Sequence, residues 1–369
     1  MAEVEIGIGK SARRGYRLDD VAIVPSKRTR DPLDVDIAWE VDAYRFELPV
    51  LGAPTDSVTS PATAIELGRL GAGGVLHLEG VWTRYVDPEP VLDEIAALPE
   101  GKATSRLQEI YAEPIKPELI GERIAEIKAS GVTCVVAVTP HRTLELADAV
   151  LQAEPDLLVV QATIVSAEHV SRGAQPLNLK DFIRHYELPV LVGGCTSYHA
   201  ALHLMRTGAA GVLVGAGSGG AVIAREVLGV GSPLATALAD ARAARMRHLD
   251  ETGVYCHVIA DGGVETGGDI ARAAACGADG VMIGTPLAAA TEAPGRGWHW
   301  GMAAVHASLP RGARVRVEPQ GTLEQILVGP ARDASGHLNL TGALRRAMAL
   351  TGYDTLKDLQ MADLVVSDP

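Results

Sequence analysis

Short apolar runs recur along most of the chain, and amphipathic stretches separate them. The runs are five to seven residues long and are rich in Val, Leu, Ile and Ala. Continuous aliphatic runs of this length are typical of parallel strands that are buried on both faces. We therefore predict eight strands, over residues 49–53, 73–77, 134–138, 156–162, 189–194, 211–215, 257–263 and 280–284.

Helical patterns follow these runs. They cover residues 60–70, 118–129, 143–152, 198–207, 232–249, 269–276 and 287–291. An alternation of this kind over roughly 250 residues predicts an α/β fold with a single TIM (β/α)8 barrel, an N-terminal segment and a C-terminal tail. We expect the tail after Pro294 to pack outside the barrel. An open Rossmann sheet is disfavoured, because no GxGxxG follows an early strand with an acidic residue about twenty positions later.

Composition narrows the class of protein. The chain has 369 residues, of which 47% are hydrophobic, and a net charge of -13, which argues against binding to nucleic acid. The apolar runs are too short for a membrane span, and the N-terminus lacks the apolar core of a signal peptide. The four cysteines show no CxxC spacing, so we expect a reduced, cytoplasmic protein without a metal site.

Glycines follow each of the last three predicted strands. In TIM barrels the loops after strands 7 and 8 often bind phosphate, because their N–H groups and a following helix N-terminus attract an anion. The alternative is that these are ordinary tight turns, but three consecutive glycine-rich turns favour phosphate binding. Asp261 is then placed to accept hydrogen bonds from ribose hydroxyls. The predicted phosphate-binding residues are Gly217, Ser218, Gly262, Gly263, Gly284 and Thr285.

Several ordered segments carry a resemblance to a known family. HVIADGGVETGGDIARAAACGADGVMIGTPLAAATEAPG, at residues 257–295, resembles the core of the IMP dehydrogenase/GMP reductase family. RLDDVAIVP (17–25), PVLGAPTDSVTS (49–60) and LTGALRRAMALTGYDTLKDL (340–359) are similar to other parts of it. Too few residues separate strands 2 and 3 for the pair of CBS domains that the family often inserts there. The chain thus resembles the short IMP dehydrogenase-related branch, with one domain over residues 1–369.

The resemblance implies an oxidoreductase that binds a purine nucleoside 5′-monophosphate and forms a homotetramer. In that family a Cys in the loop after strand 6 attacks the purine, a hydride passes to NAD(P), and water hydrolyses the adduct. Here the loop matches at Gly215, Gly217 and Ser218, but the attacking Cys has no counterpart. The Arg-Tyr pair of the family's flap is also missing from residues 295–315. Whether a monovalent cation (K⁺) occupies the loop is left open.

Three other residues are candidates for catalysis. Cys195 follows Gly194 at the end of strand 5, so we expect it to face the same cavity, either as a substitute nucleophile or as a small buried thiol. Arg225 and Glu226 are either acid/base groups on the loop or an exposed charge pair that starts a helix.

Two pairs of residues are candidates for cofactor or base contacts. Thr139 stands where the family has the Asp that holds the dinucleotide's ribose, and His141 lies on the same loop. His141 either contacts the cofactor or starts a helix. Trp298 and Trp300 either stack on a base or pack beneath the barrel rim.

Three functions remain open from the sequence. The first is an oxidoreductase acting on a purine nucleoside monophosphate, with ordinary IMP oxidation weakened by the missing groups. The second is an inactive purine-nucleotide-binding or regulatory protein. The third is an enzyme diverted to other chemistry on a related phosphorylated substrate.

Overall fold

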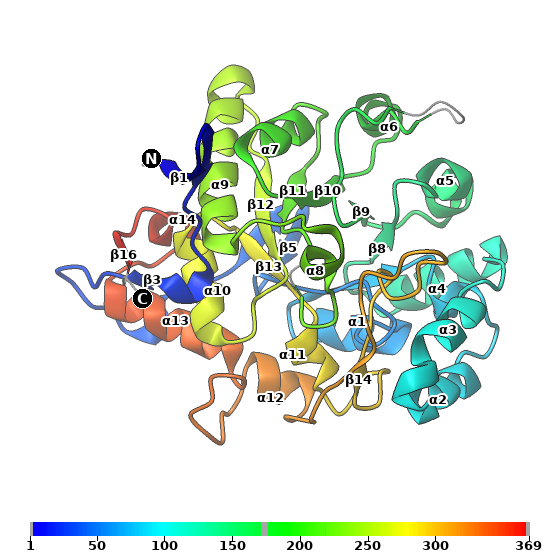
Figure 1. Ribbon diagram of the computed structural model, residues 1–369. Coiled ribbons are helices and arrows are strands. Elements are labelled where there is room, and N and C mark those ends of the chain that lie inside the picture. Colours follow the sequence, from blue (N-terminus) through cyan, green and yellow to red (C-terminus); the bar gives the residue numbers. More distant parts are fainter. Residues whose placement is uncertain (1–2, 171–175, 218, 367–369) are drawn as a thin grey trace.

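The chain folds around a closed barrel of eight strands. The computed structural model describes residues 3–170, 176–217 and 219–366 (Figure 1). Every neighbouring pair of barrel strands is parallel, in the order β10-β11-β12-β13-β6-β7-β8-β9, which confirms the predicted TIM barrel. The barrel strands are β6 (Val50–Gly52), β7 (Gly73–His77), β8 (Val135–Val138), β9 (Leu157–Gln161), β10 (Val190–Cys195), β11 (Gly211–Val214), β12 (His257–Asp261) and β13 (Gly280–Ile283).

Helices cover the outside of the barrel, and their starts are set by local sequence. Ser60 caps α1 by accepting a hydrogen bond of 3.0 Å from the Thr63 N–H, and Thr266 and Asp269 form a capping box at α10. The helices are α1 (Pro61–Arg69), α2 (Glu89–Ala97), α3 (Glu100–Ile110), α4 (Pro117–Ala129), α5 (Thr143–Ala153), α6 (Leu179–His185), α7 (Tyr198–Met205), α8 (Ala224–Leu228), α9 (Leu234–Thr252), α10 (Gly267–Ala275), α11 (Thr285–Ala288), α12 (Leu323–Leu327), α13 (Leu340–Thr351) and α14 (Leu356–Leu359). Short 3₁₀ helices lie at Leu18–Asp20, Pro32–Asp34 and Val81–Thr83.

The barrel strands are continuous aliphatic runs because each strand packs against two apolar cores. Alternate residues point to opposite faces of a strand. On β10, Leu191 belongs to the cluster inside the barrel, whereas Val190 and Val192 pack in the cluster beneath the helices. Both faces are therefore apolar, as buried parallel strands require.

A hairpin closes the amino end of the barrel. It consists of β4 (Trp39–Val41) and β5 (Tyr44–Phe46), and Trp39 and Phe46 belong to the apolar cluster inside the barrel. Trp39 donates a hydrogen bond of 3.1 Å from Nε1 to Nδ1 of His257, at the start of β12. Because the hairpin closes the amino end of the barrel, a ligand-binding site is expected at the carboxyl end.

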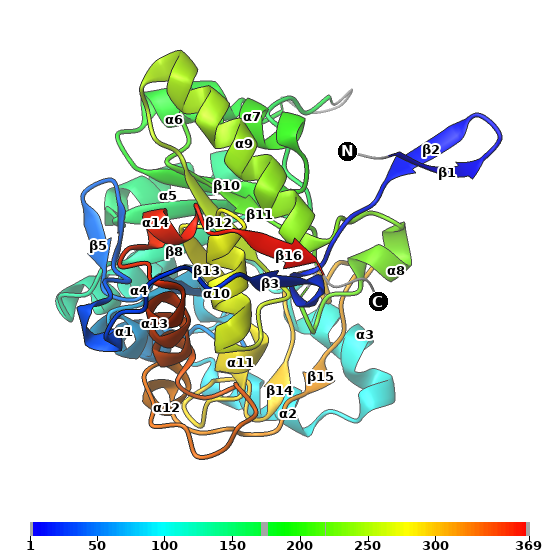
Figure 2. The same cartoon turned by 90° about the vertical axis from the view of Figure 1, so that its left-hand side faces the viewer.

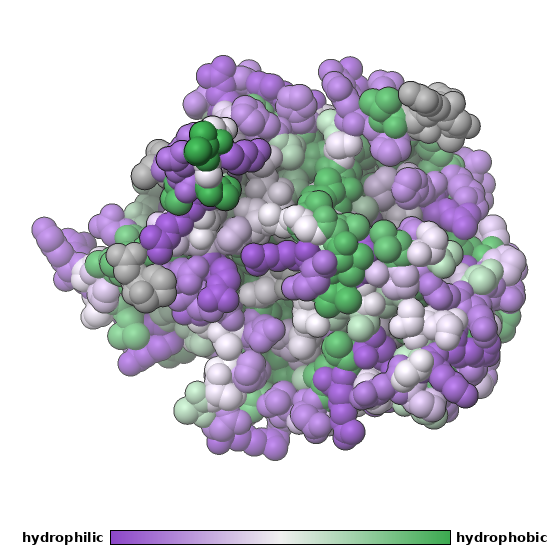
Figure 3. Space-filling view, in the orientation of Figure 1, coloured by the Kyte–Doolittle hydropathy of each residue, from purple (hydrophilic) through white to green (hydrophobic). Residues whose placement is uncertain are grey.

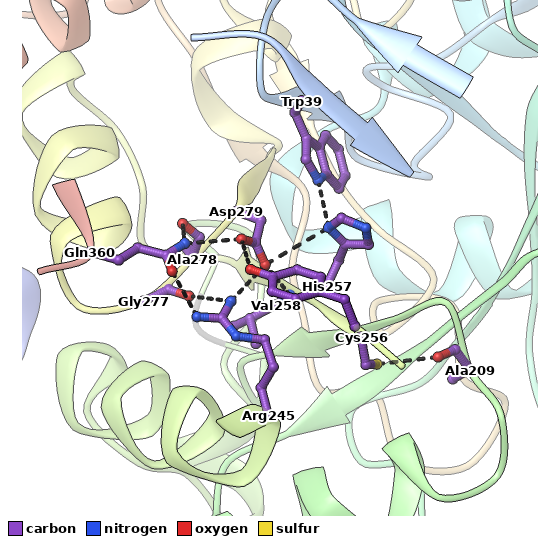
Figure 4. A network of polar contacts seen from close by, with 11 residues as sticks. Trp39, Ala209, Arg245, Cys256, His257, Val258, Gly277, Ala278, Asp279 and Gln360 are labelled. Carbon is purple, nitrogen blue, oxygen red and sulfur yellow. Dashed lines mark hydrogen bonds and ion pairs between the residues drawn. The ribbon is translucent and has the colours of Figure 1, made fainter. Parts of the chain in front are cut away.

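A buried polar network ties the C-terminal segment to the same end (Figure 4). Asp279 accepts 2.8 Å bonds at Oδ2 from Nη1 of Arg245 on α9 and from the Val258 N–H. Gln360, just after α14, accepts from Nη2 of Arg245 at 2.7 Å and donates to Oδ1 of Asp279 at 2.9 Å. The ion pair is thus almost fully hydrogen-bonded, as a buried charge requires.

Two regions differ from the sequence prediction. The acidic stretch up to Lys116 contains α2 and α3, which the sequence analysis did not predict. The tail after Pro294 packs outside the barrel only in part: α12, α13 and α14 do so, but residues 298–313, here called the returning segment, run back over the carboxyl end of the barrel. This segment contains β14 (Trp298–His299), which pairs with β15 (Val315–Arg316).

The N-terminal strands lie at the edge of the molecule. β1 (Glu3–Gly7) and β2 (Lys10–Arg13) form a hairpin that projects from the body (Figure 2). β3 (Val21–Ile23) pairs with β16 (Leu364–Val366), so the segment after the hairpin lies beside the C-terminal strand. None of the described helices is both long and apolar enough to cross a membrane.

Candidate active site at the carboxyl end of the barrel

A cavity of about 640 Å³ opens at the carboxyl end of the barrel strands. Its walls come from the loops after β6, β7, β8, β9, β11, β12 and β13, and from the returning segment. Pockets that bind small molecules or cofactors have volumes of roughly 300–1,000 Å³. This is therefore the place in the fold where a nucleotide-sized ligand fits.

Most of the predicted site residues line this one cavity. The structure brings them together from four separate loops, although they are far apart in the sequence. Ser218 falls outside the described residues. The predicted residues that line the cavity are Gly217, Asp261, Gly262, Gly263, Gly284 and Thr285, together with Thr139 and His141 at its other end.

The loops after β12 and β13 present backbone to the cavity. Gly262 and Gly263 have φ angles of +85° and +68°, a left-handed conformation that glycine adopts without steric cost. After β13 the chain turns at Gly284, whose carbonyl accepts from the Ala288 N–H at 2.9 Å, and α11 begins at Thr285. The first N–H groups of a helix have no partner within the helix; Pro286 has no N–H, so in α11 the N–H groups of Thr285 and Leu287 are the ones available to an anion.

Asp261 lies beside these glycines and is held by a residue that the sequence analysis missed. Gln161, at the end of β9, donates from Nε2 to Oδ2 of Asp261 at 2.7 Å. Burial raises the pKa of Asp261 to about 6, and the hydrogen bond from Gln161 opposes that rise. The sequence signal that could have revealed Gln161 was a polar residue at an inward-facing position of an otherwise aliphatic strand.

A second residue that the sequence analysis missed is His299, on β14. Its side chain is only 4% exposed, yet it lines the cavity next to Gly284. Nδ1 lies 2.8 Å from Oγ of Ser57, in the loop after β6. Burial lowers the pKa of His299 to about 4, so the ring is neutral at physiological pH.

The end of the cavity beside β7 and β8 carries a buried polar cluster. Glu79 accepts at Oε1 from the Thr139 N–H at 2.5 Å, and its own N–H donates to Nδ1 of His77 at 3.1 Å. Nε of Arg84 donates to the Glu79 carbonyl at 2.9 Å. Burial lowers the pKa of His77, and the nearby Glu79 carboxylate opposes that shift. The sequence analysis also missed this cluster, although Glu79 and Arg84, two charged residues shortly after β7, were a signal for it.

The two tryptophans of the returning segment pack and do not line the cavity. Trp300 is buried and donates from Nε1 to the Tyr111 hydroxyl at 2.9 Å, and that hydroxyl donates to Oδ2 of Asp56 at 2.5 Å. The guanidinium of Arg314 lies 3.7 Å from the centre of a Trp298 ring. Packing beneath the barrel rim is therefore the interpretation that agrees with the structure.

The three catalytic candidates lie away from the cavity. Cys195 is 1% exposed and packs in the cluster beneath the helices, where burial raises its pKa to about 12. The expectation that it faces the cavity is wrong, because the pairing of β10 with β11 shifts register between Gly193 and Cys195 and alternation across the strand is broken. Arg225 and Glu226 are exposed on α8, so the exposed charge pair is the interpretation that agrees with the structure.

The loop after β11 is fastened to the returning segment. Val222 forms an antiparallel bridge with Gly312, and the Ile223 N–H donates to the Arg311 carbonyl at 2.9 Å. Toward the cavity the described part of this loop presents three glycines and the Val222 side chain. No cysteine lines the cavity within the described chain, and the same ranges contain no group of three or more His, Cys, Asp or Glu that could hold a metal ion.

Comparison with known proteins identifies the family of this barrel. The model of the IMP dehydrogenase / GMP reductase domain matches residues 15–367. The chain belongs to the IMP dehydrogenase/GMP reductase family. A crystal structure of an IMP dehydrogenase/GMP reductase-like protein from Corynebacterium glutamicum superposes with a TM-score of 0.94 at 45% identity, over 99% of this chain and 98% of that one.

Curated members of the family extend the comparison. Uncharacterized oxidoreductases from Mycolicibacterium smegmatis and Mycobacterium tuberculosis are each 52% identical to this chain, over 98% of it and 99% of the relative. Inosine-5′-monophosphate dehydrogenase from Methanocaldococcus jannaschii is 24% identical, over 77% of this chain and 74% of the relative. The chain is therefore an oxidoreductase-like member of the family.

Proposed function

We propose that this protein is an IMP dehydrogenase-related oxidoreductase that binds a purine nucleoside 5′-monophosphate in the cavity. The observation that carries the proposal is the meeting of the glycine turns after β11, β12 and β13 beside Asp261. The turns supply N–H donors for the phosphate, and the Asp261 carboxylate accepts from the ribose hydroxyls. The purine then extends toward the centre of the barrel.

The other end of the cavity suits the nicotinamide of NAD(P). A carboxamide and a ribose need both donors and acceptors. The Thr139 hydroxyl, His141 and the Glu79 carboxylate line this end and provide both kinds of group. When bound there, NAD(P) would supply a hydride acceptor.

The covalent route of the family is not available through the groups that line the described cavity. That route needs an activated thiolate. Each of the four cysteines is buried, and burial raises the pKa of Cys134, Cys195 and Cys276 to about 11 or 12. We infer that ordinary IMP oxidation by this protein is absent or very slow.

Two related functions compete with this one. A regulatory protein that binds the nucleotide without turnover is consistent with the absence of a nucleophile from the described part of the loop after β11. An enzyme with other chemistry on a related phosphorylated substrate fits the polar cluster around Glu79 and His77.

The proposal includes a homotetramer in the cytoplasm. Apolar side chains are exposed on and beside α8, near the middle of the face in Figure 3, and include Ile223 at 40% and Val230 at 43%. The projecting hairpin also exposes Val4 and Ile6. Contiguous apolar patches of this kind mark surfaces that contact another chain.

Two assays test the proposal. In a thermal-shift assay with IMP, GMP and XMP, a ligand at 100 times its Kd stabilises the fold by about 2.7 kcal/mol. A change in reduced-nicotinamide absorbance with the bound nucleotide and NAD or NADP supports an oxidoreductase. Binding without such a change favours the regulatory protein, and no shift with any nucleotide contradicts the proposal.

A further inference from the structure

The hydrogen bonds around Ser57 favour one tautomer of His299. The Ser57 hydroxyl has one proton, and it donates that proton to the Trp300 carbonyl at 2.9 Å, because a carbonyl can only accept. Oγ accepts from the Trp300 N–H at 3.2 Å. The 2.8 Å contact with Nδ1 of His299 therefore needs its proton from the imidazole. With the Ser57 proton on the Trp300 carbonyl, we assign the neutral ring as the Nδ1–H tautomer, in which Nε2 carries a lone pair.

Nε2 lies next to the predicted phosphate position. Nε2 has no hydrogen-bond partner among the described residues, yet it is not enclosed by protein, and the ring lines the cavity. A Cβ placed on Gly284 would lie 3.2 Å from Nε2, so this nitrogen lies directly beside the turn at which α11 begins. An anion bound at this turn has Nε2 as a neighbour.

A lone pair and a phosphate oxygen repel each other unless a proton lies between them. We propose that His299 binds the phosphate group through one proton shared between Nε2 and a phosphate oxygen, so that binding takes up one proton from solvent. This inference rests on the proposed function and adds a specific contact to it. It also makes the protein select phosphorylated ligands in a pH-dependent way.

Several ionisable residues lie around His299, but burial is the only cause of the shift in its pKa. The ionisable residues on the elements packed around it are Asp56, Tyr111, Asp261, Glu292, Arg314 and Arg316. The Tyr111 hydroxyl donates a hydrogen bond to the Asp56 carboxylate, and the Arg314 guanidinium lies over the Trp298 ring. Burial alone lowers the pKa of His299, so the proton must arrive with the anion.

The test is calorimetric titration of the full chain with IMP between pH 7 and 8.5. Phosphate monoesters have their second pKa near 6, so the free ligand is already a dianion in this range. Uptake of one proton predicts that Kd rises about tenfold for each unit of pH. In buffers of different ionisation enthalpy, the apparent binding enthalpy at pH 7.5 should differ by the equivalent of one proton.

Two variants separate the roles of the ring nitrogens. His299→Gln carries an amide N–H toward the Nε2 position, so it should bind IMP with a Kd that is nearly constant over this pH range. His299→Asn can keep the bond to Ser57 but does not reach the phosphate, so it should lose both affinity and pH dependence. Inosine, which lacks the phosphate, should show no proton uptake with the parent protein.

The outcomes distinguish this inference from the proposed function. Tight IMP binding with no proton uptake, or with the same pH dependence in His299→Gln, overturns the role of His299 and leaves the nucleotide site intact. If inorganic phosphate binds with proton uptake that depends on His299 while IMP does not bind, the role of His299 is supported and the nucleotide is wrong. If neither IMP nor phosphate binds, both proposals fall.

Discussion

Gln161 donates a hydrogen bond of 2.7 Å to the Asp261 carboxylate from β9 to β12, with β10 and β11 between them. Burial raises the pKa of Asp261 to about 6, and the hydrogen bond from Gln161 lowers the pKa by less than burial raises it. The carboxylate is thus held in place at some cost to the ligand-free fold. We propose that this carboxylate is the group that binds the ribose hydroxyls.

Asp261→Asn should stabilise the ligand-free protein at neutral pH. The folded pKa lies above the ordinary value of 3.8, so the parent loses stability as pH rises from about 3.8 through about 6. The amide cannot ionise and avoids this loss, and a gain of a few degrees in Tm is expected at pH 7.5, with none at pH 4. Thermal unfolding at the two pH values checks this, and a lower Tm for Asp261→Asn at pH 7.5 would contradict it.

Incubation with IMP and NAD should produce no covalent adduct on the protein. The four cysteines are buried, and a thiol that is not ionised is a poor nucleophile. Intact mass spectrometry should show the unmodified mass for the parent and for Cys195→Ala alike. An adduct of nucleotide mass, or robust turnover in both proteins, would show that another group supplies the nucleophile.

Val222→Cys should create a reactive thiol in the cavity. Val222 lines the cavity on a loop whose other described lining residues are glycines. Iodoacetamide should label this variant, IMP should slow the labelling, and the parent should remain unlabelled under the same conditions. Labelling that IMP does not slow would place the nucleotide elsewhere.

Asp279→Ala should strongly destabilise the fold. It leaves Arg245 buried without its counter-ion, and breaking a buried pair in this way costs about 3–5 kcal/mol. The control is Glu94→Ala, which removes an exposed partner of Arg106 and should cost about 1 kcal/mol or less. Chemical denaturation measures both, and equal losses would contradict the structural role assigned to this network.

The barrel was predictable because each strand is buried on both faces. Such strands must be continuous aliphatic runs, and the eight runs correspond to β6 to β13 with small differences at their ends. The glycine turns were predictable for a related reason, since the left-handed conformation of Gly262 and Gly263 favours residues without a side chain.

The missed parts of the site depend on contacts that sequence spacing does not encode. His299 lies in the returning segment, and tertiary contacts such as that between Ser57 and the chain at 299–300 bring its ring to the turn at Gly284. Cys195 was assigned to the cavity because it ends strand 5, but the register shift beside Gly193 turns it to the outer face. The sequence of a short run of glycines does not reveal such a register shift.

The central claim is that Asp261 and the glycine turns bind a purine nucleoside monophosphate, and calorimetric titration with IMP tests it most directly. The parent should bind IMP with one site per chain, and inosine should bind far more weakly. Asp261→Ala should lose about 1.5–3 kcal/mol of binding free energy, as expected for loss of a charged hydrogen bond, whereas Glu265→Ala, at the rim of the same cavity, should bind nearly as the parent does. No binding of IMP, or equal affinity in the parent and Asp261→Ala, would contradict the account.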